Sequence, residues 1–234
     1  GVQTCALPIL DAKAAIQGLL SGAGIGIDGQ ADLAGLPIAE LDGILGADGL
    51  LAELLGERLN LTARASGEAG NPIAMRIAAN SERMSFDAPL AVSRGIRLAS
   101  PAMARLTIGD RLLAFVMEKK GEDASGRRFR LTEPAALEAS IERFEWPMQE
   151  TAEGMKPNPA AGRLSLAARI ERLAMLDAAK NQRSAFQNMR LAINADDLSK
   201  PIPFDLSAEI ATESGAGSAP GAGKMQIEGT IGNL

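Results

Sequence analysis

From Leu59 onward, apolar and polar side chains alternate along the chain with a period of two. In the first such run Leu59, Leu61 and Ala63 alternate with Asn60 and Thr62. Successive side chains of a strand point to opposite faces of a sheet, so this pattern predicts strands with one apolar and one polar face. Further runs with this period lie at 73–78, 84–93, 164–170, 189–195, 204–210 and 225–231.

The block at 96–108 recurs at 129–141. Each copy begins with an apolar residue followed by Arg-Leu, has Pro-Ala at its centre and ends in Ile. Both copies read as strand, proline, strand, and a recurring unit of this size indicates a repetitive β architecture. Between the copies we predict a short helix at 110–118, with Asp110 as its cap.

The region before Leu59 has a different character. Residues 1–9 resemble the translation of a common short-read sequencing adapter, and we interpret them as an artefact. Residues 10–58 are predicted to be helical and rich in turns, with a helix at 10–20 and glycine-rich turns at 24–35 around a short strand at 25–27. Two short helices with a bend at the glycines are predicted at 37–57.

Together these patterns predict a mainly β fold with short helices, of the α+β class. We expect a repetitive antiparallel sheet that is elongated and curved or groove-like, with a helical N-terminal segment. A first β region is predicted at 59–148 and a second at 164–234, which we expect to be truncated. An exposed loop is predicted between them at 149–163, since it holds Pro157, Pro159 and several charges.

Composition excludes several kinds of chemistry. The chain has no histidine, and its one cysteine, Cys5, lies in the segment interpreted as an artefact. Zinc sites built from His or Cys and nucleophilic systems that need a histidine are therefore excluded. A net charge of −5 argues against nucleic acid as a partner, because phosphate binding needs a concentrated basic face. We predict no cofactor, no metal and no catalytic residue.

The apolar face of the predicted sheet is built from Ala, Leu, Ile and Met, with few aromatic rings. One interpretation is a closed core packed against helices or a second sheet. The other is a long apolar groove that holds phospholipid acyl chains, which small and flexible side chains would leave room for. The residues predicted to line that groove, the groove set, are Leu59, Leu61, Met75, Ile77, Met84, Phe86, Ile141, Leu166, Ile170, Leu191, Ile193, Phe204, Leu206, Met225 and Ile227.

Three glutamates are the remaining candidates for catalysis. Glu138, Glu142 and Glu171 lie in similar contexts, and paired carboxylates can act as acid and base on a glycosidic bond. A carboxylate-dependent hydrolase requires that they converge in a pocket with a raised pKa. The simpler interpretation places them on the solvated face of strands.

The helical opening followed by amphipathic strands, with LDGILGADGLLAELLGERLNLTARASG at 41–67 and KMQIEGTIGNL at 224–234, resembles the AsmA/TamB-like superfamily of bacterial envelope proteins. The resemblance implies a non-enzymatic protein with repetitive β-sheets. It also implies an N-terminal membrane anchor upstream of this sequence, a body on the periplasmic side of the inner membrane, and a role in lipid transport or outer-membrane assembly, with envelope proteins as further partners.

Three hypotheses for the function follow. The first is an envelope β-repeat protein that binds or conducts lipid along an apolar sheet face. The second is a structural or adhesive β module that binds other proteins through a sheet edge. The third is the carboxylate-dependent hydrolase.

Overall fold

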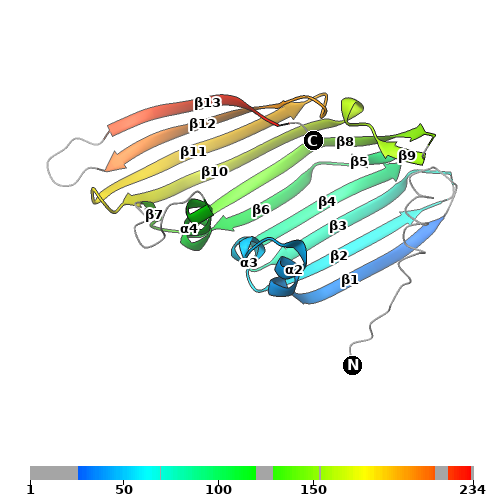
Figure 1. Cartoon of the computed structure of the whole chain (residues 1–234), viewed down its shortest axis with the longest axis horizontal. Coiled ribbons are helices and arrows are strands. Elements are labelled where there is room, and N and C mark those ends of the chain that lie inside the picture. The colour runs from blue at the N-terminus through cyan, green and yellow to red at the C-terminus, as the bar shows by residue number, and fades with distance from the viewer. Residues whose placement is uncertain (1–25, 69, 120–128, 153, 214–220, 233–234) are drawn as a thin grey trace.

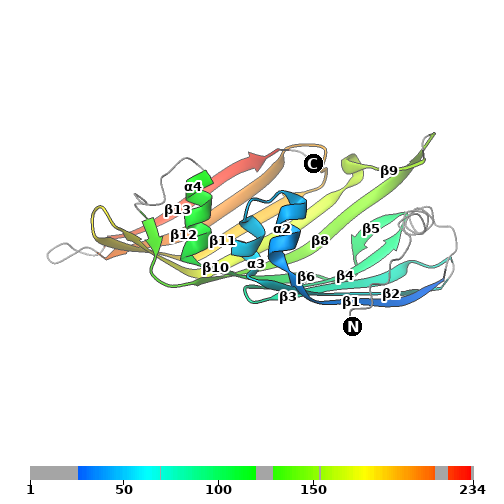
Figure 2. The ribbon, with the colours of Figure 1, turned by 60° about the horizontal axis from the view of Figure 1, so that its bottom comes forward.

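The structure is a computed structural model that describes residues 26–68, 70–119, 129–152, 154–213 and 221–232. Over these residues the chain is mainly β, and its strands form one large antiparallel sheet of 13 strands (Figure 1). The order of the strands in the sheet largely follows their order along the chain, with exceptions near the middle of the sheet, so the topology is close to a meander. Figure 2 shows that the sheet twists strongly between its two edges, as large sheets do.

The first half of the sheet contains β1 (Ile27–Pro37), β2 (Arg58–Gly67), β3 (Ile73–Ser81), β4 (Met84–Ser93), β5 (Gly95–Leu98) and β6 (Ala102–Ile108). The second half contains β7 (Phe129–Leu131), β8 (Ala135–Thr151), β9 (Gly154–Pro157), β10 (Arg163–Asp177), β11 (Gln182–Ala195), β12 (Ile202–Glu213) and β13 (Gly221–Ile231). The helices are α2 (Ile38–Leu45), α3 (Leu50–Leu55), α4 (Asp110–Lys119) and the short 3₁₀ helix η2 (Pro159–Ala161).

Each copy of the repeated block forms one long strand that is interrupted before its proline. In the first copy β5 and β6 both pair with β4, and the interruption lies at 99–101. In the second copy β7 and β8 both pair with β10, and the interruption lies at 132–134. Pro101 and Pro134 carry no N–H to donate to a neighbouring strand, which accounts for a break at the same place in both copies. The strand–proline–strand prediction and the predicted helix between the copies are confirmed.

The N-terminal region agrees with the sequence prediction only in part. The helix predicted at 10–20 lies outside the described residues. The turns predicted at 24–35 are wrong, because β1 runs from Ile27 to Pro37 and pairs with β2. Glycine and aspartate are poor strand formers, but β2 pairs with β1 along most of its length, and this pairing outweighs that weak preference.

The two short helices predicted at 37–57 are present as α2 and α3. Gly46 and Gly49 adopt positive φ angles of 62° and 91° between them, so the chain bends at the glycines as predicted. Asp42 is buried, and its carboxylate accepts hydrogen bonds from the backbone N–H groups of Gly49 and, at 2.9 Å, Leu51. This side chain of α2 therefore satisfies the free N–H groups at the start of α3.

The segment at 149–163 is more ordered than predicted. β8 extends to Thr151 and forms a hairpin with β9, and η2 follows. The prediction of a loop over this whole segment is therefore wrong. Pro157 suggests a loop, but it ends an edge strand, where the missing N–H of proline is tolerated. Beyond it, β10 pairs with β8, so one sheet runs through both predicted β regions.

The two largest fully buried side chains, Ile38 and Leu198, lie at the ends of the strands. The α-helices of the described residues gather at one end of the strands (Figures 1 and 2), where Ile38 has 0% exposure. At the other end, Leu198 in the β11–β12 connection is also 0% exposed and packs with Ala195 and Ile202. Elsewhere most apolar side chains are only partly buried, since no second layer of described residues covers the whole sheet.

Truncation of Leu198 tests the importance of this local core. Leu198→Ala is expected to lower the free energy of unfolding by about 2–5 kcal/mol, because it leaves a cavity where no neighbour can collapse fully. Ile44→Ala is the control, since Ile44 is 80% exposed and its loss should change stability by less than about 0.5 kcal/mol. Urea unfolding of both variants measures the difference. Equal effects would mean that Leu198 is not part of a stabilising core.

Candidate functional site

The register of the sheet places the whole groove set on one face. Directly opposed residues of antiparallel strands lie on the same face, and so do residues two apart along a strand. Leu166, for example, is opposite both Ile141 and Ile193, and Ile193 is in turn opposite Phe204. The same reasoning links the remaining members of the groove set from β2 to β13.

One line of residues crosses this face at right angles to the strands, and every member is apolar. Each member is directly opposite the next, from edge strand β1 to edge strand β13. The line, which we call the transverse row, consists of Leu33, Leu61, Ala79, Phe86, Ala104, Ala139, Ala168, Leu191, Leu206 and Ile227. Half of these residues, four alanines and Leu33, were not predicted to line the groove. Alanine is only weakly apolar, and Leu33 lies in a segment that was predicted to form turns. The recurrence of alanine at every second position could have identified the four alanines.

A β-bulge in β8 keeps the apolar face continuous. The pairing of β8 with β10 skips Glu142, so Leu164 and Leu166 are opposite Phe144 and Ile141. An extra residue in one strand shifts its alternation by one position. The spacing of three between Ile141 and Phe144 therefore puts both side chains on the apolar face, although strict alternation would separate them.

The apolar face is largely half-exposed. Ile170 is the only buried member of the groove set and Ile227, at 44%, the only exposed one, while the others are partly buried. The two ends of the transverse row are the most exposed, with Leu33 at 49%. A face of this size that keeps partial contact with water differs from a closed core, and contiguous apolar surface of this kind marks binding sites.

One end of this face is covered by the chain itself. Phe144 and Trp146 stack with ring centroids 6.3 Å apart, and Trp146 packs against the cluster that contains Leu198. The backbone N–H of Leu198 donates to the carbonyl of Pro159 at 2.9 Å. A Cβ at Gly162 would lie 2.9 Å from Leu198, so only glycine lets the two segments approach this closely.

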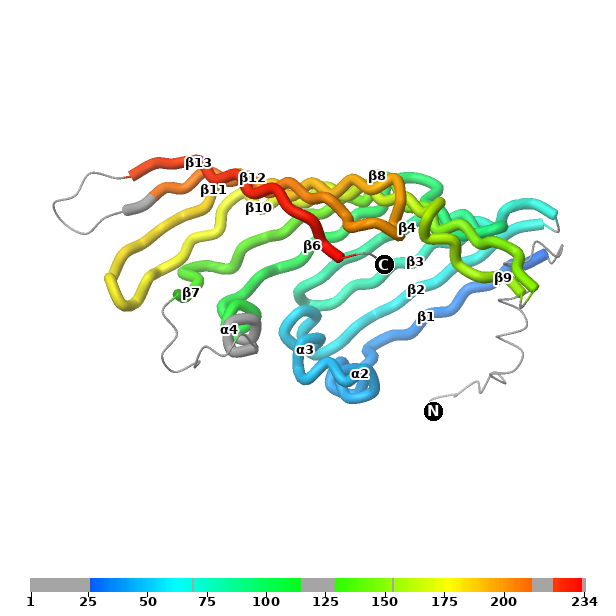
Figure 3. The backbone as a smooth tube through the Cα atoms, turned by 45° about the horizontal axis from the view of Figure 1, so that its top comes forward, coloured from blue at the N-terminus to red at the C-terminus, as the bar shows by residue number. Residues whose placement is uncertain are grey.

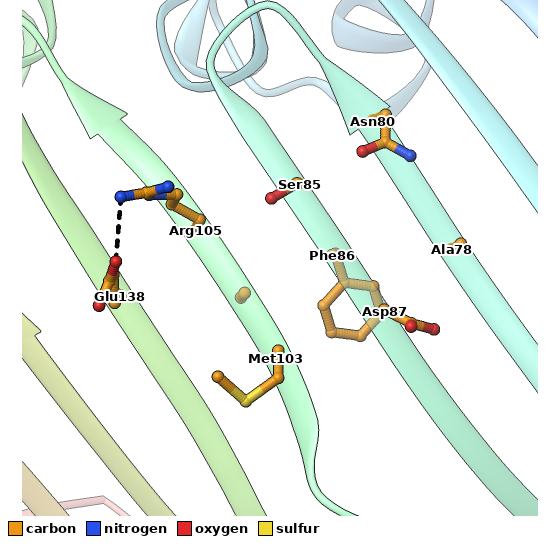
Figure 4. Close-up of a pocket in the computed structure, with 9 residues that line it drawn as sticks. Ala78, Asn80, Ser85, Phe86, Asp87, Met103, Arg105 and Glu138 are labelled. Atoms are coloured by element: carbon orange, nitrogen blue, oxygen red, sulfur yellow. Dashed lines mark ion pairs between the residues drawn. The ribbon is translucent and has the colours of Figure 1, made fainter.

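The opposite face is polar and carries arginines paired with carboxylates. Arg76 forms a bidentate ion pair with Asp87, and Glu138 lies between Arg105 at 3.0 Å and Arg169 at 2.6 Å. Figure 4 shows the Arg105–Glu138 pair at the rim of a shallow depression of about 440 Å³. Because the arginine side chains are more than half exposed, these pairs stabilise the sheet only weakly.

The glutamates that the hydrolase hypothesis needs are only partly brought together. Glu138 and Glu171 line one depression of about 230 Å³ with three arginines. Glu142 lies outside that set and accepts a hydrogen bond from the Ser140 hydroxyl. The hydrogen bond and charge of Arg169, with a smaller contribution from Arg105, lower the pKa of Glu138 from its ordinary value. A general acid needs the opposite shift, so Glu138 does not meet the requirement that this hypothesis placed on it.

Comparisons of the chain with family models, curated proteins and solved structures find no match. Among the described residues no helix combines the length and apolar character needed to cross a membrane. In the same part of the chain, no three Cys, Asp or Glu side chains are grouped so that they could hold a metal ion.

The ion pairs of Glu138 predict a pH-dependent contribution to stability. Its lowered pKa means that the contribution is present above the ordinary glutamate pKa of about 4.3 and is lost as pH falls through the folded-state value. Glu138→Gln should therefore lower the urea midpoint slightly at pH 7 and have a smaller effect at pH 2. Glu142→Gln is the control, because Glu142 has no arginine partner among the described residues. An equal loss at both pH values would show that the Glu138 ion pairs are not its cause.

Proposed function

We propose that the apolar face of the sheet binds the acyl chains of phospholipids, in a non-enzymatic envelope protein that carries lipid or serves outer-membrane assembly. The observation that carries this proposal is the transverse row, which offers apolar contact from one edge strand to the other. Neighbouring strands are about 4.8 Å apart, so ten strands give a continuous apolar path of about 43 Å.

The sizes of the side chains around the row support a groove for an extended chain. Ala139 in β8 is flanked on the same face by Leu137 and Ile141, and Ala168 in β10 is flanked by Leu166 and Ile170. The larger residues on either side of each alanine lie four positions apart, which is about 13 Å along a strand. We infer that at Ala139 and Ala168 the row forms a short trough with an alanine floor and aliphatic walls, which has room for part of an acyl chain lying across these strands.

The curved, groove-like shape and the cellular location are parts of the same proposal. A sheet that curves around its apolar face would shelter an acyl chain from water better than a flat one. The resemblance to the AsmA/TamB-like superfamily supports a body on the periplasmic side of the inner membrane, with an anchor upstream of this sequence. The meander of amphipathic strands agrees with the repetitive sheets that this resemblance implies.

Co-purified lipid is the direct test of the proposal. We expect organic extracts of the purified chain to contain phospholipid by mass spectrometry, and the delipidated protein to take up a fluorescent fatty acid. A well-folded, lipid-free protein that takes up none would contradict the proposal.

Substitution of two adjacent alanines distinguishes binding on the apolar face from binding on the polar face. Ala168→Asp places a charge in the transverse row and is expected to weaken fatty-acid uptake about tenfold or more, since a charged group is costly to desolvate. Ala167→Asp is the matched control, because Ala167 is exposed on the opposite face, opposite Ser140 and Ala192. Fluorescence titration of both variants measures the uptake.

A variant that keeps the row apolar covers the case in which Ala168→Asp does not fold. Ala139→Leu adds a larger side chain to the trough floor and should reduce uptake while circular dichroism still reports a sheet. Equal uptake by the wild type, Ala167→Asp and a folded row variant would show that acyl chains do not bind along this row.

A further inference from the structure

Two arginines lie directly opposite each other on the polar face of the sheet. Arg169 of β10 is opposite Arg190 of β11, and these two strands run side by side in the second half of the sheet (Figure 3). Each arginine is next to a member of the transverse row, so both lie on the face opposite that row. Like charges in opposed positions are destabilising, so this pair needs a compensating charge or a function.

The carboxylate beside Arg169 compensates only part of this charge. Glu138 of β8 lies between Arg105 and Arg169, with its oxygens 3.0 Å and 2.6 Å from their nitrogens. One negative charge is therefore shared by two guanidinium groups. The line of opposed residues from β6 to β11 continues to Arg190, so it carries three positive charges and one negative charge.

Arg190 has no carboxylate of its own. It is exposed, and within the described residues its guanidinium has no hydrogen-bond or ion-pair partner. On its other side it is opposite Ser207 of β12, a neutral residue that can donate a hydrogen bond through its hydroxyl. The surroundings of Arg190 therefore offer hydrogen-bond donors to a ligand.

Carboxylates of the neighbouring strands do not pair with Arg190. Glu209 of β12 accepts a hydrogen bond from the Asn188 amide at 3.0 Å. Asn188 has a positive φ of 51° and lies in a β-bulge, where the register between β11 and β12 shifts just before Arg190. Glu171 is exposed and interacts electrostatically with Arg169, without an ion pair in the described part of the chain. Bulges are frequent next to functional sites, because they redirect side chains.

The depression beside Glu138 is a poorer place for an anion than the β11 side of Arg169. Arg105, Arg169 and Arg172 line it, but so do three glutamates, two of which form ion pairs with these arginines. On the side of Arg169 that faces β11, Arg190 stands where a carboxylate would otherwise compensate the charge. An anion is therefore favoured between Arg169 and Arg190.

A second pair of opposed arginines shows how the protein itself neutralises such a pair. Arg64 of β2 is opposite Arg76 of β3, again on the polar face. Arg76 forms a bidentate ion pair with Asp87, and Arg64 interacts electrostatically with Asp32. Two carboxylates of the described residues thus compensate that pair, which makes Arg64 the natural control for Arg190.

We propose that a phosphate group binds on the polar face between Arg169 and Arg190. Such a group carries about −1.5 to −2 charges at pH 7, so it can neutralise both opposed guanidinium groups. Its oxygens can accept two parallel hydrogen bonds from one guanidinium, and the Ser207 hydroxyl offers a further donor. One phosphate group needs far less positive surface than nucleic acid does. The inference concerns the face opposite the acyl-chain groove, and each proposal can fail without the other.

Titration of the full-length chain with inorganic phosphate tests the proposed site. Isothermal titration calorimetry near neutral pH and at low salt should show binding by the wild type. Arg169→Gln and Arg190→Gln each remove one of the two guanidinium groups and should raise the Kd about tenfold or more. Arg64→Gln is the matched control, because it removes one exposed arginine from the same face and should leave the Kd near the wild-type value.

A conservative variant and urea unfolding separate geometry from charge. Arg190→Lys keeps the positive charge but loses the planar fork, so it should bind phosphate more weakly than the wild type and more tightly than Arg190→Gln. In phosphate-free buffer Arg190→Gln should raise the urea midpoint slightly, because it relieves the like-charge contact with Arg169. Added phosphate should raise the midpoint of the wild type and not that of Arg190→Gln.

Vesicles distinguish the two sources of a phosphate group. Phosphatidic acid presents a phosphate monoester at a membrane surface, and phosphatidylcholine vesicles are the control. Co-sedimentation with phosphatidic acid vesicles that is lost in Arg190→Gln would identify a lipid headgroup. Binding of inorganic phosphate without co-sedimentation would identify a soluble phosphate. Both results support a phosphate site at these two arginines.

Three outcomes overturn the proposal. The first is a folded wild-type chain that binds no phosphate. The second is an equal loss of affinity in Arg190→Gln and Arg64→Gln, which indicates a general attraction to the arginines of the polar face. The third is a lowered urea midpoint of Arg190→Gln in phosphate-free buffer, which would show that the protein itself already supplies a partner for Arg190.

Discussion

The backbone register of the antiparallel meander is the constraint on which the rest of this structure depends. Directly opposed residues share a face, so the transverse row is apolar only because each strand is held at one particular offset from the next. A slip of one residue in any strand would exchange the two faces of that strand. The bulge at Glu142 depends on the same constraint. It adds one residue to β8, so that Ile141 and Phe144 both lie on the apolar face although they are three positions apart.

A single twisted sheet has a different energetic problem from a two-layered domain. Within the described residues no second layer covers its apolar face, and only the strand ends are covered, by the α-helices and the Leu198 connection. Most of the stability of the centre must come from backbone pairing and from contacts between neighbouring side chains on each face. The remaining apolar surface is available for a ligand.

The polar face illustrates why residue type alone is a poor guide to catalysis. Glu138 and Glu171 do line one depression, as a hydrolase would need, but Arg105, Arg169 and Arg172 line it as well. The arginines come from separate strands and their proximity to Glu138 depends on the register. They hold the pKa of Glu138 low, which favours a structural ion pair over a general acid.

The sequence by itself determined the mainly β class, most of the strands, the interruption before Pro101 and Pro134, and the bend between α2 and α3. These depend on local properties: a side-chain period of two, the missing N–H of proline and the conformational freedom of glycine. Only the tertiary structure decided that Ile27–Pro37 forms a strand, that 149–163 contains a hairpin, and that the apolar residues line up in one row. Each of these depends on which partner strand lies alongside and at what offset, and that information is shared between distant parts of the chain.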